Sequence, residues 1–450
     1  MTMIGDWLTD DIAKAVGGAA EGDSVAFTRV TTDSRADCSG ALFVALKGDR
    51  FDGHEYIDAA VSQGAVAVMA QAKANADVAQ IIVPDSLAGL GRLGALNRSR
   101  FNGPVAAVTG SAGKTTVKEL LASILSQRGD VCKTQGNFNN HIGVPLSLLQ
   151  LTEEHRSAVF ELGASAVGEI AYTVALARPQ VAILNNAAAV HVEGFGDLAS
   201  IVKAKGEIVC GLPEDGVAVL NKDDANFSAW VEMAGARKVI SFGLDDSAMV
   251  RAQNIHLELN GSTFRLSAPE GGIDATLPLP GAHNVRNALA AAAAALALGW
   301  TLEEVRDGLA SAAPVKGRMN KLLGINGSVI LDDTYNASPT SMKAAIDVLA
   351  RYPGRRIVAL GHMGELGSVA EDAHREVAQY ARDNGVDMLL GIGRWAAEYR
   401  EGFGDESPVV TTHDDIAAWL RERLDSNTTV LVKGSRSAAM ENVVKQIVEK

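Results

Sequence analysis

The segment 105–116, Val-Ala-Ala-Val-Thr-Gly-Ser-Ala-Gly-Lys-Thr-Thr, constrains the fold more than any other part of the chain. Its apolar start predicts a buried strand, Gly110 and Gly113 predict a tight loop, and a helix is expected from about Lys114. This order of elements cradles phosphate, because backbone N–H groups and the positive end of the helix dipole meet at the loop. A polar turn before a helix is the alternative, and the apolar strand argues against it.

The residues of this loop have distinct predicted roles. We expect Lys114 to neutralise the β- and γ-phosphates and the Thr115 hydroxyl to ligate Mg²⁺. Val108 stands where the common GxxxxGK[ST] pattern has its first glycine, so the shorter GxxGKTT form points to a subfamily. The predicted nucleotide-binding residues of the loop are Gly110, Ser111, Ala112, Gly113, Lys114, Thr115 and Thr116.

Short apolar runs alternate with helical patterns along the chain, which predicts the α/β class with parallel sheets. A length of 450 residues suits about three domains. Breaks at Pro84 and at Pro314 predict domains of residues 1–84, 85–313 and 314–450. The predicted strands are 41–46, 65–69, 81–83, 105–108, 158–160, 181–184, 329–331, 357–360, 388–390 and 430–432.

Composition excludes several classes of protein. A formal net charge of -13 argues against a general nucleic-acid binder, which needs clustered Lys and Arg. The longest apolar run, 288–298, is far shorter than the ~20 residues that cross a bilayer, so we expect no membrane span. Cys38, Cys132 and Cys210 form no disulfide or zinc pattern, which suits a reducing cytoplasm.

Two further side chains follow predicted strands of the central region. Glu161 comes directly after the strand 158–160, and His191 follows the strand 181–184 by one loop. Ligands in open α/β sheets lie at such carboxyl ends, so both become candidate metal ligands beside the phosphate loop. Alone, each would be read as a surface or hydrogen-bonded residue, and Lys205 as a solvated helix lysine.

Ordered segments across the whole chain resemble the Mur ligases of peptidoglycan synthesis, with folylpolyglutamate synthase as a more distant relative. The segments are TGSAGKTT (109–116), NFNNHIGVP (137–145), ELGAS with GEI (161–170), AVHVEGFG (189–196), AKGEI (204–208), GAHNVRNALAA (281–291), GRM (317–319), DDTYNASPTSM (332–342) and KGSRSAAME (433–441). The resemblance implies a central P-loop ATPase domain. It also implies an N-terminal α/β domain that binds a UDP-sugar and a C-terminal Rossmann-like domain that binds the acceptor and completes the ATP site.

Within this family the chain is most similar to the member that adds D-alanyl-D-alanine to UDP-N-acetylmuramoyl-tripeptide. That reaction consumes ATP, forms ADP and passes through an acyl phosphate. The segment GHMGELG (361–367) departs from the family pattern at His362, where Asp is usual, and at Gly364, where a larger residue is common, while Glu365 keeps the acid. We do not expect His362 to be a ligand.

Three alternatives remain open at this point. Another Mur ligase step is one, although the DNPR-like segment typical of the ligase that adds the third stem residue is missing from the sequence. A folylpolyglutamate synthase-like ligase is the second. The third is a phosphate-loop switch that binds a nucleotide and signals through a partner, and it would hydrolyse nucleotide without the ligase substrates.

The resemblance implies two Mg²⁺ sites. It assigns Thr115 and Glu161 to one, and His191 with a carbamylated Lys205 to the other. An ammonium group cannot ligate Mg²⁺, but its CO₂ adduct presents two anionic oxygens. The four residues named as catalytic are Lys114, Glu161, His191 and Lys205.

The remaining assignments by resemblance concern nucleotide and substrates. We expect adenine and ribose to be held by Asn287, Asp332 and Asn336, and a phosphate by Arg318. The simpler interpretations are a helix cap for Asn287 and a surface salt bridge for Arg318. Ser34 and Arg35 are natural partners of the UDP diphosphate. The other predicted substrate residues are Asn137, Asn139, Asn140, Lys433, Ser435 and Arg436. We expect a monomer.

Overall fold

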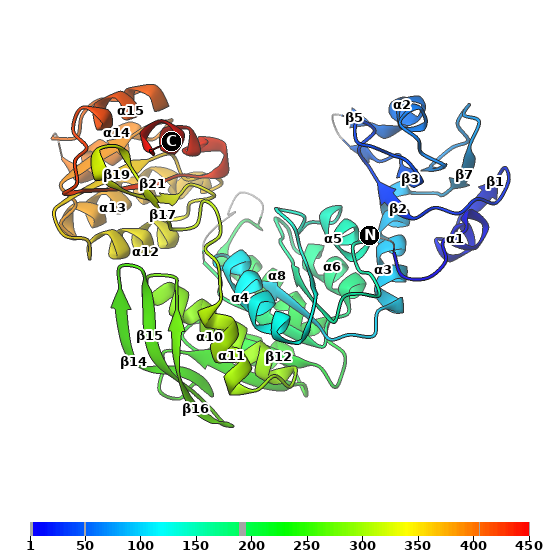
Figure 1. Cartoon of the computed structure of the whole chain (residues 1–450), viewed down its shortest axis with the longest axis horizontal. Helices are drawn as coiled ribbons and strands as arrows, with labels where there is room; N and C mark the ends of the chain where they lie inside the picture. The colour runs from blue at the N-terminus through cyan, green and yellow to red at the C-terminus, as the bar shows by residue number, and fades with distance from the viewer. Residues whose placement is uncertain (1–2, 49–50, 189–194, 405, 450) are drawn as a thin grey trace.

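The computed structural model describes residues 3–48, 51–188, 195–404 and 406–449, and it folds into three α/β bodies, each built on its own sheet (Figure 1). The first sheet has the strand order β1-β7-β6-β3-β2. Its strands are β1 (Ala19–Glu21), β2 (Arg29–Thr31), β3 (Ala41–Val44), β6 (Ala67–Ala70) and β7 (Ala79–Ile82). Helices α1 (Thr9–Ala15) and α2 (Ile57–Ser62) and the hairpin β4 (Lys47–Gly48) to β5 (Phe51–Asp52) complete this body. The predicted α/β class is confirmed.

The central sheet has nine strands in the order β16-β15-β14-β13-β12-β11-β8-β10-β9. Its parallel part contains β8 (Val105–Thr109), β9 (Val131–Lys133), β10 (Ser157–Glu161), β11 (Val181–Leu184), β12 (Val217–Asn221) and β13 (Lys238–Gly243). Strand β14 (Val250–Glu258) extends it, and β15 (Gly261–Ala268) and β16 (Gly271–Leu277) add an antiparallel edge.

Helices cover both faces of this sheet, as the buried β8 sequence requires. Ala106 and Val108 pack on one face against α4 (Lys114–Leu125), α10 (Ala282–Ala297) and α11 (Leu302–Ala310). Val105 and Ala107 pack on the other face. The helices there are α5 (Gly143–Leu148), α6 (Glu169–Ala177), α8 (Leu198–Cys210) and α9 (Phe227–Ala234). Side chains alternate along a strand, so an all-apolar strand fits only between two helical layers.

The third sheet has the order β17-β18-β21-β19-β20. Its strands are β17 (Asn320–Leu323), β18 (Val329–Asp333), β19 (Arg355–Leu360), β20 (Met388–Gly391) and β21 (Thr428–Lys433), parallel except for β17. Helices α12 (Pro339–Leu349), α13 (Ala370–Asp383) and α14 (Ala396–Phe403) pack on one face, and α15 (His413–Arg421) and α16 (Glu441–Ile447) on the other.

Helix α3 (Ser86–Arg100) fastens the first body to the second. Leu90 and Leu93 pack in the core beneath the first sheet. Farther along, the buried Asn97 side chain accepts from the Ile4 N–H at 3.0 Å and donates to two carbonyl oxygens of the central body, at 2.8 and 3.0 Å. The three sheets fall inside the three predicted ranges, and we propose 1–84, 85–313 and 314–450 as the domains, with α3 shared between two cores.

The segment 311–319 between α11 and β17 joins the central and third domains. The turn between β14 and β15 also reaches the third domain (Figure 1). There Tyr352 donates its hydroxyl to the Leu259 carbonyl at 3.0 Å, and Lys321 Nζ donates to Asn260 Oδ1 at 2.8 Å. Among the described residues, no helix is both long and apolar enough to traverse a membrane.

Candidate active site

The glycine loop lies between β8 and α4, as predicted from the sequence. Gly113 has φ +80°, and a Cβ placed on it would lie 2.5 Å from both Asn185 Nδ2 and Asn287 Oδ1. Backbone and neighbours therefore both require glycine at this position. The helix begins at Lys114, so its free N–H groups point into the loop.

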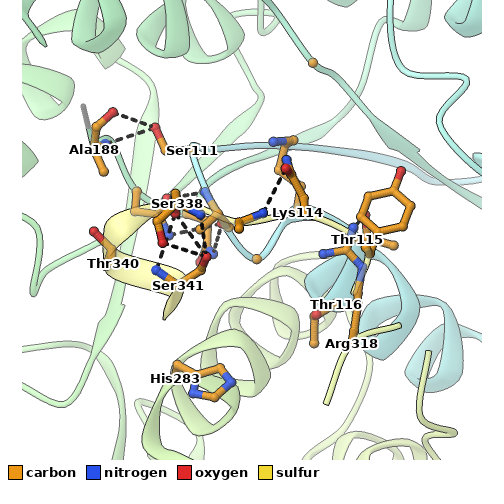
Figure 2. A pocket seen from close by; sticks show the side chains of 18 of the residues that line it. Ser111, Lys114, Thr115, Thr116, Ala188, His283, Arg318, Ser338, Thr340 and Ser341 are labelled. Atoms are coloured by element: carbon orange, nitrogen blue, oxygen red, sulfur yellow. Dashed lines mark hydrogen bonds between the residues drawn. The ribbon is translucent and has the colours of Figure 1, made fainter. Parts of the chain in front are cut away.

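The side chains of the loop are held by its own backbone and by the residues after β11. Lys114 Nζ donates to the Gly110 carbonyl at 2.8 Å, and Ser111 Oγ donates to the Ala188 carbonyl at 3.1 Å (Figure 2). Burial lowers the pKa of the Lys114 ammonium. A desolvated cation beside free helix N–H groups attracts a phosphate strongly, since an anion restores the solvation that the lysine has lost.

A chain of hydrogen bonds joins the loop to β10 and to the third domain. Arg318 Nη2 donates to Thr115 Oγ1 at 2.8 Å, and Thr115 Oγ1 donates to Glu161 Oε2 at 2.8 Å. Asn139 Nδ2 donates to the second oxygen, Glu161 Oε1, at 2.9 Å. Figure 2 shows Arg318 beside Thr115 at the start of α4. The predicted pair of Thr115 and Glu161 is thus brought together, with both oxygens in hydrogen-bond contact.

These groups open into one cavity of about 1080 Å³ between the central and third domains. Most of the predicted residues of these two domains line it. They are Ser111, Ala112, Gly113, Lys114, Thr115, Thr116, Asn139, Asn140, Glu161, Asn287, Arg318, Asn336, Lys433, Ser435 and Arg436. Gly110, Asn137, Asp332 and Lys205 are outside this lining, and His191 lies outside the described residues.

Asparagines form the side of the cavity next to α10. Asn185 Nδ2 donates to Asn287 Oδ1 at 3.1 Å and to the Ala112 carbonyl at 2.9 Å, while Asn287 donates to Asn284 Oδ1 at 3.3 Å. His283 lies beside them, and burial lowers its pKa to about 4. An uncharged imidazole and several amides suit an uncharged, hydrogen-bonding ligand such as a nucleoside base.

The carboxylate that reaches the cavity from β18 is that of Asp333. The sequence pointed to Asp332, but its buried Oδ1 accepts from the Thr334 hydroxyl at 2.6 Å and its side chain is outside the cavity lining. Asp333 lines the cavity and accepts from Lys433 Nζ at 2.5 Å. Neighbouring strand residues face opposite ways, so a shift of one position exchanges the two carboxylates.

Lys205 is buried behind the cavity, on α8. Its side chain is 1 % exposed, its Nζ lies 3.5 Å from the Ala164 carbonyl oxygen, and it stands 5.4 Å from the Phe195 ring centre. Burial, followed by the charge of Lys114, lowers the pKa of Lys205 to about 7. The simpler reading of Lys205 as a solvated helix lysine is therefore wrong. A large share of this amine is neutral at physiological pH and so can react with CO₂.

The predicted residues of the first domain lie apart from this cavity. Arg35 is exposed and donates from Nε and Nη2 to both oxygens of Asp33, at 2.8 and 2.9 Å, and this pairing lowers the pKa of Asp33 to about 2. Ser34 is half-buried between them. Neither residue lines the central cavity.

The third-domain residues after β21 are already paired. Lys433 is 3 % exposed and also donates to the Asn336 carbonyl at 2.9 Å, whereas Arg436 pairs with Glu441 at 2.8 Å. Ser435 is buried and reaches the cavity. Among the asparagines of segment 137–145, Asn140 accepts from the N–H groups of Ile142 and Gly143. The exposed Asn137 contributes its carbonyl to a turn.

Sequence reasoning missed two asparagines that hold the loop. Asn185 supports Gly113 and Asn287, and Asn186 Oδ1 accepts from the Ala112 N–H at 2.8 Å. Their position in the sequence could have identified them, because both follow the strand 181–184 directly, at the same sheet edge as Glu161. His283 and Asp333 are also among the lining residues that the sequence reasoning did not name as site residues.

Family models match all three parts of the chain. Residues 26–97 match the "Mur ligase family, catalytic domain", residues 108–295 the "Mur ligase middle domain" and residues 317–436 the "Mur ligase, glutamate ligase domain". These matches follow the three sheets in order.

Individual relatives extend over nearly the whole chain. The UDP-N-acetylmuramoyl-tripeptide--D-alanyl-D-alanine ligase of Escherichia coli K12 is 44% identical over 441 residues, covering 96% of both chains. A crystal structure of MurF from Acinetobacter baumannii superposes with a TM-score of 0.94 at 36% identity, covering 99% of this chain and 100% of that one. MurF ligase from Thermotoga maritima, in complex with ADP, gives 0.83 at 30% identity, covering 93% and 96%. This chain belongs to the Mur ligase family.

Proposed function

We propose that this chain is the ATP-dependent, ADP-forming ligase that joins D-alanyl-D-alanine to UDP-N-acetylmuramoyl-tripeptide, which makes the pentapeptide precursor of peptidoglycan. The observation that carries this proposal is one cavity lined both by the phosphate loop and by third-domain residues such as Lys433 and Ser435. A ligase needs ATP and acceptor in one space, whereas a switch does not. The named relatives of E. coli and A. baumannii support the same reading.

The first step converts a poor leaving group into a good one. A carboxylate oxygen of the tripeptide attacks the γ-phosphorus of ATP, a P–O bond forms and the bond to ADP breaks. Charge spreads over the transferring phosphoryl oxygens, so cations fixed around them stabilise the transition state. Lys114 and Arg318 both line the cavity and are the cations we assign to this role.

The second step forms the amide. The dipeptide amine attacks the acyl carbon, the C–N bond forms, the C–O bond breaks and phosphate leaves. Water would destroy the acyl phosphate, and the cavity lies between two domains that can close on it.

The described residues suit a Mg²⁺ ion at the phosphate loop. The Thr115 hydroxyl and the Glu161 carboxylate are hard oxygen donors 2.8 Å apart. Among the described residues no three His, Cys, Asp or Glu side chains gather as a metal site, so phosphates and water would supply the other ligands, as Mg²⁺ prefers. When bound, Mg²⁺ polarises the phosphoryl oxygens and neutralises their charge.

A second Mg²⁺ held by carbamylated Lys205 and by His191 is also part of our proposal. The support is the chemistry of Lys205, because a buried amine with a pKa of about 7 adds CO₂ readily and gains two anionic oxygens. The assignment of His191 as the second ligand rests on the resemblance to the family alone.

The substrate assignments are proposals of the same kind. Asn287 and Asn336 would hold the nucleoside, with Asp333 joining Asp332 as a candidate because it faces the cavity. Ser34 and Arg35 would bind the UDP diphosphate, and Arg35 would exchange Asp33 for phosphate. The three asparagines of segment 137–145 would contact the sugar peptide, and Lys433, Ser435 and Arg436 the acceptor. We also propose a monomer in the cytoplasm, where three free cysteines are stable.

A coupled assay tests the function. Phosphate release from ATP is measured with UDP-N-acetylmuramoyl-tripeptide and D-alanyl-D-alanine together, with each alone, and with single amino acids or a folate in place of the proper partner. We expect release only when both substrates are present, and a mass increase of one dipeptide in the product. Release without an amine would indicate a nucleotide switch, and release with a single amino acid would indicate another ligase step.

A further inference from the structure

A histidine and two serines form a hydrogen-bonded row at the acceptor side of the cavity. His362 Nε2 lies 3.0 Å from Ser437 Oγ, and Ser437 Oγ lies 3.1 Å from Ser435 Oγ. Both serines line the cavity that holds Lys114 and Glu161, whereas His362 stands behind them. The row thus connects the cavity to an imidazole outside it.

The fold fixes the imidazole in this position. The Ser435 N–H donates to the His362 carbonyl at 3.0 Å, which ties the two strand ends together. On the other side the backbone of Gly393, with φ +93°, comes so close that a Cβ there would lie 3.0 Å from His362 Nδ1. The imidazole ring of His362 therefore lies between the Ser437 hydroxyl and the backbone of Gly393.

Burial lowers the pKa of His362, so that the ring is mainly neutral at pH 7 and can accept a proton. The charged or titratable side chains on the elements around it include Glu365 on its own loop, Lys433 and Arg436 on the facing segment, Arg394 after β20, His374 on α13, and Glu398 and Tyr399 on α14. Lys433 is paired with Asp333, Arg436 with Glu441, and Arg394 stacks over Trp395. The buried His374 is fixed by two backbone groups, since its Nε2 accepts from the Met363 N–H at 2.9 Å.

The ligase reaction requires a group that accepts a proton from the acceptor ammonium. The acceptor amine arrives as an ammonium ion, which has no lone pair and cannot attack the acyl phosphate. A proton must leave before the C–N bond forms, and a nearby base with a pKa close to the working pH serves best. Glu161 accepts from Thr115 and Asn139 and is assigned to Mg²⁺, so it is not free to act as this base.

We propose that His362 is a positioning residue for the acceptor amine, and that it takes up the ammonium proton through Ser437 and Ser435. This inference rests on the proposed function. The ammonium gives a proton to Ser435 Oγ, Ser435 passes its own to Ser437, and Ser437 passes its own to His362 Nε2. The freed amine attacks, the C–N bond forms, the C–O bond to phosphate breaks, and the departing phosphate takes the second proton. The imidazolium then returns its proton to water.

Three variants test the row. His362→Gln keeps a polar group near Nε2 but cannot hold a proton, His362→Asp replaces the base by one of lower pKa, and Ser437→Ala cuts the row without touching His362. His413→Gln is the matched control, because His413 holds the same segment through the Ala438 carbonyl at 2.8 Å and offers no relay into the cavity. Folding of each is checked by thermal melting.

The readout is kcat with D-alanyl-D-alanine from about pH 6 to about pH 9, beside a parallel reaction with hydroxylamine. Hydroxylamine is uncharged at neutral pH and needs no proton removed before it attacks. We expect His362→Gln and Ser437→Ala to lose on the order of 10- to 100-fold in kcat with the dipeptide. Their loss should be largest at low pH and shrink as the pH rises toward about 8, the ordinary pKa of an α-amino group, because the free amine then needs no base. Hydroxamate formation and the KM for ATP should stay as in the unmodified protein. His362→Asp should move the acidic limb of the pH profile to lower pH, and His413→Gln should change nothing.

Equal losses with dipeptide and hydroxylamine would overturn the inference, since they would make the row merely structural. An unchanged pH profile in His362→Gln or Ser437→Ala would overturn it as well. Failure of the proposed function looks different, because then the unmodified protein itself would form no dipeptide adduct. In that event the same variants are compared with the amine that the protein does accept.

Discussion

The guanidinium of Arg318 donates to the hydroxyl of Thr115 at 2.8 Å, and this bond joins two residues 203 positions apart across the domain boundary. Thr115 donates in turn to Glu161. A protein cation therefore rests on the pair of oxygens to which we assign Mg²⁺. Arg318 also lies 4.2 Å from the Tyr335 ring centre, which keeps it near the phosphate loop when Thr115 changes partner.

Replacing Arg318 by Ala should weaken nucleotide binding. A hydrogen bond that involves a charged group contributes about 1.5 to 3 kcal/mol, so we expect the KM for ATP to rise on the order of tenfold or more. Initial rates at varied ATP and fixed Mg²⁺ give this number. Arg306→Ala serves as the control, because Arg306 is paired with Asp307 outside the cavity. An unchanged KM for ATP would remove Arg318 from the phosphate site.

Replacing Lys114 by Ala should abolish measurable turnover. Loss of a single fixed donor to a developing charge lowers kcat on the order of 10²- to 10³-fold, and Lys114 supplies a full charge as well. Phosphate release with both substrates is the measurement. Lys114→Arg keeps the charge but not the compact ammonium geometry, so it should recover only part of the rate. Normal turnover of Lys114→Ala would refute the assignment of the loop.

Activity should depend on CO₂, and more strongly as the pH rises. The folded-state pKa of Lys205 is about 7, below its ordinary value of 10.5, so the neutral amine that adds CO₂ grows as the pH rises through 7. After removal of bicarbonate the rate should fall, and added bicarbonate should restore more of it at pH 8 than at pH 6. A ¹³C NMR signal of a carbamate in labelled bicarbonate gives an independent readout. A reaction rate that does not change with added bicarbonate after acid dialysis would contradict carbamylation of Lys205.

Activity lost in Lys205→Ala should return in part with short-chain carboxylates such as acetate or propionate. The truncated side chain leaves space in a buried site, where a small carboxylate can present the oxygens of the missing carbamate. Rate is measured against carboxylate concentration, with chloride at equal ionic strength as the control. A folded variant without rescue would count against the carbamate.

Replacing Asn97 by Leu should separate the first domain from the second. The substitution leaves the Ile4 N–H and the carbonyls of Leu148 and Leu151 without partners, at about 1 to 3 kcal/mol for each buried group. We expect a loss on the order of 3 kcal/mol and an early unfolding transition in urea. Asn384→Ala, which removes one hydrogen bond at the end of α13, is the comparison and should shift the curve far less. Coincident curves for the two variants would contradict the role of Asn97.

Much of the site followed from sequence because its parts are local. The strand, loop and helix around Gly113 are adjacent in the chain, and α4 begins at Lys114 as expected. Glu161 needed only the rule that ligands lie at the carboxyl ends of parallel strands, which also applied to Asn185 but was not used there.

The rest depended on contacts between distant segments. Which of Asp332 and Asp333 reaches the cavity is decided by how β18 faces the central domain, which strand periodicity alone does not determine. The burial of Lys205 arises in part from the loop after β10, where its Nζ meets the Ala164 carbonyl 41 positions earlier in the chain. Strands β14 to β16 escaped prediction because their residues alternate between buried and exposed, whereas we sought continuous apolar runs.

The contacts between the central and third domains have a mechanical consequence. Described contacts that cross the boundary include single hydrogen bonds, from Tyr352 and Lys321 to the β14–β15 turn and from Arg318 to Thr115. Small polar contacts of this kind allow domains to move relative to one another. We therefore expect the two domains to change their relative orientation during turnover, and the bond from Arg318 to Thr115 would couple that change to the phosphate loop.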